Sequence, residues 1–315
     1  MEPSLGKKKK SFQMVDLLLL ITVIIWGINP TVVKISLREF SPFAFNAARY
    51  VVATVVCWVL LLWIEKDWRV HRKDLIPILV IGLFGNFVNQ TFFIIGVNNT
   101  TAGNSSLIMA GVPMIAAIIN GILKIEKISE RVALGIATSF AGILLIILGS
   151  GSRISLVDQY FYGNLMMMGN AITWSFYTVI NKKYLNKYSA LRLTTYGVSV
   201  GTLCMLIFWS GALRTQDWRS ISMINYGGMF YSGALSIAAG TLFWNLGIEK
   251  VGSTKTSLFS NVTPIVSVIC GGILLQESFK LLQGAGALLI FAGLSIVNRK
   301  EIKETAVAAV EEQSV

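Results

Sequence analysis

Charged residues are scarce in this sequence. Only 14% of the 315 residues are Asp, Glu, Lys or Arg, whereas 54% are hydrophobic. A soluble domain usually has about 25% charged residues, so this chain has too few to cover a globular surface. The hydrophobic residues instead form runs long enough to cross a bilayer, which takes roughly 20 residues per helix. The composition therefore predicts an all-α polytopic membrane protein and excludes an ordinary soluble domain.

Histidine and cysteine, which often bind metals, are also scarce. His71 is the only histidine, and Cys57, Cys204 and Cys270 lie in separate apolar runs without a C-x-x-C spacing. We therefore expect no disulfide framework, no metal site and no cofactor. The sequence has no P-loop and no H-E-x-x-H motif, and no carboxylate falls in the middle of an apolar run. These absences argue against an intramembrane enzyme and an ATP-driven pump, and favour a facilitator or exchanger.

The apolar runs predict ten transmembrane helices. The first five are expected at about 15–34, 42–64, 75–96, 102–123 and 130–149. The second five are expected at about 161–181, 190–211, 223–247, 254–275 and 281–298. Residues 1–14 form a basic N-terminus, 150–160 a linker between the two sets, and 299–315 a polar tail.

The chain is basic, with 27 Lys and Arg against 16 Asp and Glu. Most of the basic residues fall in the loops on the side that also holds both termini, and few fall on the other side. Positive charge is retained on the cytoplasmic side of membrane proteins, so we expect both termini in the cytoplasm and the protein in the plasma (inner) membrane. The charges are spread over short loops rather than gathered on one face, so no nucleic-acid partner is expected.

The two sets of helices resemble each other. Identical residues recur at a separation of 148 and then of 151 residues. The pairs include Trp26 and Trp174, Lys34 and Lys182, Ser41 and Ser189, Gly82 and Gly233, Pro113 and Pro264, Glu126 and Glu277, and Gly142 and Gly293. Because five helices are an odd number, the second set must enter the membrane from the opposite side. This predicts two inverted five-helix repeats, at 15–149 and 161–298, an arrangement typical of alternating access.

One family shares these features. The first helix reads Trp26-Gly27-Ile28-Asn29-Pro30, and Lys34, Pro42-Phe43 and Arg49 follow. This opening, with the Pro, Glu and Gly pattern that closes each half, resembles the EamA-type transporters of the drug/metabolite transporter superfamily over about residues 15–298. The resemblance implies ten helices, two EamA repeats, and export or exchange of small metabolites. It also implies a central cavity lined by the first, third, fourth, sixth, eighth and ninth helices, with the fifth and tenth outside.

Polar and aromatic residues within the apolar runs are the candidates for lining that cavity. They are Trp26, Asn29, Asn86, Asn89, Gln90, Asn104, Trp174, Tyr177, Thr241 and Trp244. Asn29-Pro30 is expected to interrupt the first helix and expose a carbonyl group. Asn86, Asn89 and Gln90 are spaced to share one helix face, where they either line a translocation path or join helices by hydrogen bonds.

Two basic residues are charged candidates. Arg49 lies deep within the second run, where an isolated charge is costly and usually faces the bundle interior. It either attracts an anionic group of the substrate or serves as a structural arginine that binds neighbouring helices. Lys34 lies near the outer end of the first helix and either contributes to the site or extends to the membrane surface.

The predicted function is therefore transport of an amino acid-like or drug-like metabolite by alternating access, as efflux or exchange. An intramembrane enzyme and a channel-like pore are the alternatives. The expected partners are a small-molecule substrate and the lipid bilayer. A homodimer formed through the glycine-rich fifth and tenth helices is a further hypothesis.

Overall fold

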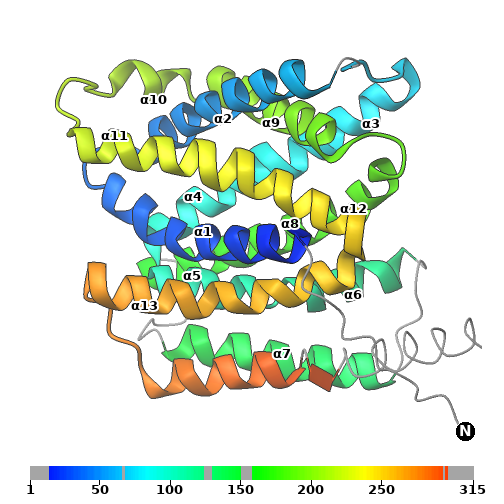
Figure 1. The fold of residues 1–315 in the computed structure, drawn as a ribbon. Coiled ribbons are helices and arrows are strands. Elements are labelled where there is room, and N and C mark those ends of the chain that lie inside the picture. The colour runs from blue at the N-terminus through cyan, green and yellow to red at the C-terminus, as the bar shows by residue number, and fades with distance from the viewer. Residues whose placement is uncertain (1–13, 66–67, 124–129, 150–157, 294, 297–315) are drawn as a thin grey trace, which may run out of the picture.

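The protein is built from helices that lie roughly parallel to one another (Figure 1). The computed structural model describes residues 14–65, 68–123, 130–149, 158–293 and 295–296. No strand occurs within those ranges. The prediction of an all-α protein is confirmed.

The helices lie close to the predicted positions. The first half contains α1 (Met14–Ser36), α2 (Pro42–Ile64), α3 (Arg72–Gly82), η1 (Leu83–Val88), α4 (Asn89–Asn99), α5 (Ala102–Met109), α6 (Val112–Ile122) and α7 (Glu130–Gly149). The second half contains α8 (Gln159–Leu185), α9 (Ala190–Phe208), α10 (Ser210–Thr215), α11 (Met223–Phe230), η2 (Tyr231–Ala239), α12 (Gly240–Phe259), η3 (Ser260–Val262) and α13 (Thr263–Leu275). A last helix spans Leu281–Gly293.

Six helical stretches are long and apolar enough to cross a membrane. They are Met14–Ser36, Pro42–Ile64, Arg72–Asn99, Ala102–Ile122, Val132–Gly149 and Ala190–Phe208. Two shorter apolar helices, Ser260–Leu275 and Leu281–Gly293, follow toward the C-terminus. The chain is thus a multi-pass membrane protein.

Prolines interrupt two of the predicted helices. The chain leaves the α-helix between α5 and α6, just before Pro113, and forms the 3-10 turn η3 just before Pro264. Proline has no N–H, and its ring clashes with the carbonyl group four residues earlier. Each predicted helix, at 102–123 and 254–275, is therefore split at the same position of its repeat.

Two predictions about helix continuity were wrong. The predicted break at Asn29-Pro30 does not occur, because α1 runs through Pro30 to Ser36. A proline removes one backbone hydrogen bond, and the packing of α1 against α12 and α13 stabilises the helix on either side of it. The loop expected near 248–253 is absent as well, since α12 continues to Phe259. No proline lies within α12 to stop it.

The third helix of each half contains a π-helical segment that the sequence pattern did not predict. These segments are η1 (Leu83–Val88) and η2 (Tyr231–Ala239). Shifting η1 by 151 residues, the separation of the repeat, places it within η2. Local π-helix is rare and is frequently found at functional sites.

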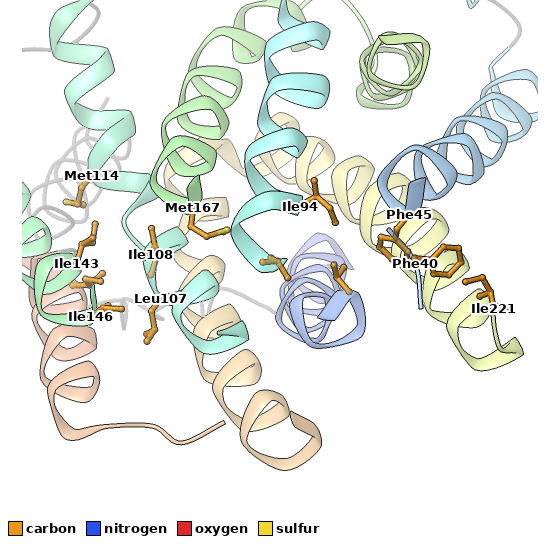
Figure 2. Close-up of a cluster of buried hydrophobic side chains, with 14 residues drawn as sticks. Phe40, Phe45, Ile94, Leu107, Ile108, Met114, Ile143, Ile146, Met167 and Ile221 are labelled. Carbon is orange, nitrogen blue, oxygen red and sulfur yellow. The ribbon is translucent and has the colours of Figure 1, made fainter. Parts of the chain in front are cut away.

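A buried hydrophobic cluster joins the first-half helices to α8. Figure 2 shows Met167 of α8 between Ile108 of α5 and Ile94 of α4. A Cβ atom on Gly96 of α4 would lie 2.6 Å from the Met167 sulfur, so a glycine is needed for this close approach. Small residues at helix contacts are typical of membrane proteins, where close packing replaces the hydrophobic effect.

The helix α7 and the last helix form a pair at one edge of the protein (Figure 1). A Cβ atom on Gly142 would lie 2.5 Å from the Gly286 oxygen, and one on Gly293 would lie 2.5 Å from the Gly135 oxygen. Gly142 and Gly293 are a repeat pair, and so are Gly135 and Gly286. These glycines of the predicted fifth and tenth helices therefore face each other within one chain.

The loops at the two ends of the bundle are tied by matching contacts. At one end Lys187 forms an ion pair with Asp74, and Ser189 donates a hydrogen bond to Glu65. At the other end Glu39 accepts a hydrogen bond from the Ser222 backbone N–H at 2.7 Å, and Gln216 accepts one from the Ser41 backbone N–H at 2.8 Å. The contacts at both ends are therefore formed in the same structure.

Candidate functional site

Four aromatic side chains from three helices meet in the interior. Trp26 of α1 contacts Trp174 of α8 with ring centroids 5.6 Å apart, and contacts Trp244 of α12 at 5.2 Å. Trp174 stacks on Tyr177 at 5.1 Å. Trp26 and Trp174 are half-buried, whereas Tyr177 and Trp244 are buried. The structure thus brings four predicted site residues together, and two of them keep exposed surface.

The polar atoms of this aromatic cluster differ in how they are satisfied. The Trp26 indole N–H donates to the Ser236 carbonyl oxygen at 2.9 Å. The Tyr177 hydroxyl accepts hydrogen bonds from Asn181 and Asn245. The buried indole N–H of Trp244 has no acceptor among the described residues. Buried donors are nearly always paired, so this N–H is available to a ligand or a water molecule.

Arg49 is fully buried and is bound by uncharged groups. Its Nε donates to Asn46 Oδ1 at 2.8 Å, its Nη1 to Ser232 Oγ at 2.8 Å and its Nη2 to Gln90 Oε1 at 2.6 Å. The guanidinium carbon also lies 5.0 Å from the centre of the Phe93 ring. No described carboxylate forms an ion pair with it.

The Arg49 contacts continue to the first helix. Ser232 of η2, which accepts from Arg49, donates its own hydroxyl hydrogen to Asn29 Oδ1 on α1 at 2.8 Å. Asn29 is buried. The predicted residues Asn29, Arg49 and Gln90 therefore belong to one hydrogen-bonded chain that links α1, η2, α2 and α4.

The polar stripe predicted on the third helix is divided between two neighbours. Asn86 accepts a hydrogen bond from the Tyr50 hydroxyl, so both it and Gln90 face α2. Asn89 instead donates to the Asn170 carbonyl oxygen and the Thr173 hydroxyl of α8. Of the two roles considered for these residues, the contacts observed are those of hydrogen bonds between helices.

Asn104 lies in a second polar cluster, apart from the aromatic cluster. It accepts from Gln283 Nε2 at 2.6 Å, and its own Nδ2 lies 3.4 Å from Asn164 Oδ1. Lys34 also lies at this end, where its ammonium donates to the Thr100 carbonyl oxygen at 2.5 Å. Thr241 of α12 is buried and directly follows Gly240. The Trp26 indole packs against Gly240.

Several polar residues of these clusters were not predicted. They are Asn46, Asn164, Asn170, Asn181, Ser232, Asn245 and Gln283. Asparagine and glutamine within an apolar run were a usable signal, because an amide in lipid needs partners. Within the described ranges no group of His, Cys, Asp and Glu is arranged to hold a metal ion.

Comparison with known proteins identifies relatives over nearly the whole chain. The EamA-like transporter family matches residues 13–148 and 161–299, one segment in each half. An uncharacterized transporter of Archaeoglobus fulgidus is 28% identical over 90% of this chain and 98% of its own length. The uncharacterized transporter YyaM of Bacillus subtilis is 26% identical over 85% of this chain and 88% of its own length.

Two further likenesses extend the comparison. A WAT1-related protein of Arabidopsis thaliana is 27% identical over 82% of this chain and 77% of its own length. One protein of known crystal structure is similar with a TM-score of 0.62, covering 91% of this chain and 97% of that one. Its sequence identity is 15%, so the likeness concerns the fold.

Proposed function

Because the chain belongs to the EamA-like transporter family, we propose that it carries a small metabolite across the plasma membrane by alternating access, as efflux or exchange. The named relatives are transporters, and the chain is a multi-pass membrane protein. An amino acid-like or drug-like compound is the proposed cargo.

The proposed architecture is ten spans in two inverted repeats, with both termini in the cytoplasm. Contacts between equivalent residues support it. Thr54 and Thr202, 148 residues apart, share a hydrogen bond of 2.6 Å between α2 and α9. Trp26 and Trp174, also 148 apart, touch each other. A residue touches its own repeat partner only near a two-fold axis between the halves, which is where transporters of this kind bind their cargo.

The substrate site is proposed on the half-exposed faces of Trp26 and Trp174. The observation that carries this assignment is the contact between these two equivalent indoles, one from each half. The N–H of Trp244, which has no acceptor among the described residues, adds a hydrogen-bond donor beside them. Arg49 is proposed as a structural residue, since its guanidinium group is bound by three side chains and has no exposed surface.

Counterflow into liposomes that contain the purified protein tests this function. A panel of labelled metabolites should include at least one whose uptake is saturable and driven by the same unlabelled compound inside. Uptake that never saturates would indicate a pore, and conversion of a metabolite would indicate an enzyme. Either result would contradict the carrier.

The site is tested by Trp174→Leu, with Trp63→Leu as the matched control. Trp63 is 83% exposed on α2 and lies outside the aromatic cluster. Trp174→Leu should raise the KM of counterflow, because an aromatic face contributes about 0.5–1.5 kcal/mol beyond its area. The control should leave the KM unchanged. Equal values for both variants would place the substrate elsewhere.

A further inference from the structure

The chain between α4 and α5 is bound by two opposite charges. The Lys34 ammonium donates to the Thr100 carbonyl oxygen at 2.5 Å and to the Val97 carbonyl oxygen at 3.4 Å, at the end of α4. The Glu277 carboxylate accepts from the backbone N–H groups of Ala102 at 2.8 Å and Gly103 at 3.2 Å, at the start of α5. A helix end carries partial negative charge and a helix start partial positive charge, so both charges are favourably placed.

The backbone after α13 directs Glu277 to this position. Gln276 has a φ of 56°, the only positive φ of a non-glycine residue in the described chain. This left-handed turn brings the Glu277 N–H to 3.2 Å from the Gly271 carbonyl oxygen. A Cβ atom on Gly271 would lie 2.8 Å from Oε2 of Glu277, so the carboxylate occupies the space that a side chain at position 271 would need.

The surroundings of Lys182, the repeat partner of Lys34, differ within the described residues. Lys182 is exposed and forms no hydrogen bond with any described residue. The helix that corresponds to the α4–α5 break is continuous, since α12 runs from Gly240 to Phe259. Glu126, the repeat partner of Glu277, lies outside the described residues. Among the residues that the structure describes, a lysine and a glutamate hold the two sides of a helix break at Lys34 and Glu277.

The packing of the fourth helix is consistent with closure at that end. Its first half, α5, packs mainly against α13 and α8, and also against α1 and α7. Its second half, α6, packs mainly against α8 and α7. The buried hydrogen bond from Gln283 to Asn104, at 2.6 Å, adds a further contact between the two repeats beside Glu277.

We propose that Lys34 and Glu277 form a latch that closes the extracytoplasmic end of the transport path by holding the α4–α5 break. In the other state of the cycle the latch opens and α5 separates from α13. Lys34 and Glu277 are thus positioning residues of the gate. The proposal rests on the proposed carrier function and topology, in which the ends of α1 and α13 face away from the cytoplasm.

The test measures access to α5 from outside the cell. Ser106, which is 4% exposed on α5, is changed to cysteine in a full-length chain without Cys57, Cys204 and Cys270. A membrane-impermeant maleimide is added to intact cells, and the rate of labelling is followed. In the starting protein the closed latch should keep this rate low.

Gly271→Ala and Gly272→Ala are a matched pair for this test. An alanine at position 271 must displace the end of the flexible Glu277 side chain, which the fold can accommodate. At position 272 the nearest atom is 3.9 Å away, so the latch stays in place. Gly271→Ala should label about tenfold faster, corresponding to about 1.4 kcal/mol in the gate equilibrium. Gly272→Ala should label at the starting rate.

Lys34→Met and Glu277→Gln test the two charges separately and should both increase labelling. Melting temperatures show whether each variant is folded. The proposal is overturned if the folded latch variants and the Gly272→Ala control are labelled at the same rate. It is also overturned if the latch variants are labelled faster only when the maleimide reaches the protein from the cytoplasmic side. The labelling rate measures access to α5 and does not require transport. A failure of the proposed carrier function would be detected in the liposome counterflow experiment, which is independent of this test.

Discussion

Replacing Arg49 by lysine measures what the planar guanidinium group contributes to the stability of the protein. Lysine keeps the positive charge, so the cost of burying a charge is about the same in both proteins. The three side chains that accept hydrogen bonds from the Arg49 guanidinium lie on three elements, α2, α4 and η2. A single ammonium on a flexible stem cannot reach all of them, and we expect only one of the hydrogen bonds to survive.

The size of the effect follows from the hydrogen bonds that are lost. The bonds to Gln90 and Ser232 join Arg49 to other elements, whereas Asn46 is on the same helix. Hydrogen bonds between membrane helices contribute about 0.6 kcal/mol on average and up to about 1.7 kcal/mol. Losing two of them should destabilise Arg49→Lys by about 1–3.5 kcal/mol. The melting temperature in detergent should fall by several degrees, while the KM of counterflow in the surviving protein stays the same.

Arg219→Lys is the control, because Arg219 is exposed in a loop and the same exchange there should change neither quantity. The structural role of Arg49 would be refuted by one result in particular. If Arg49→Lys melts at the starting temperature and binds substrate more weakly, then Arg49 binds an anionic group of the cargo.

Three further predictions concern the backbone, the glycine contacts and pH. Gln276→Gly should raise the melting temperature, because glycine avoids a left-handed penalty of about 1–2 kcal/mol for other residues, and an unchanged or lower value would contradict this strain. Gly142→Ala should lower the yield of folded protein through its clash with the Gly286 oxygen, whereas Gly211→Ala, with open space around it, should be neutral. Hydrogen bonds from Asn225 and Ser222 lower the pKa of the Glu39 carboxyl below its ordinary value of about 4.3. Its contribution to stability is therefore present above about pH 4.3 and lost as the pH falls through the lower folded-state pKa, so the melting curves of wild type and Glu39→Gln should converge on acidification.

Much of this protein follows from local sequence because lipid restricts what a chain can do. A backbone within a bilayer must pair its own N–H and C=O groups, so an apolar run of sufficient length predicts a helix. The helices α1, α2 and α7 begin and end within a few residues of the predicted positions for this reason. The sequence also showed the duplication, since Trp26 and Trp174 occupy equivalent places in two similar halves.

The partners of the polar residues could not be predicted in this way. Asn86, Asn89 and Gln90 were placed on one face by helical spacing, but η1 precedes Asn89 and the three residues contact two different helices. A π-helical segment depends on the packing of neighbouring elements more than on the residues within it, so a regular helical count fails there.

The sequence by itself therefore determined the class of protein, the position of most helices and the family. Only the tertiary structure decided that Arg49 binds Ser232, which is 183 residues away, and that Lys34 and Glu277 bind the two ends of one helix break. Hydropathy measures how well a single helix suits a lipid environment, and it depends only on the residues of that helix. The choice of a hydrogen-bond partner depends on which helices pack together, and that depends on the shape of the whole bundle.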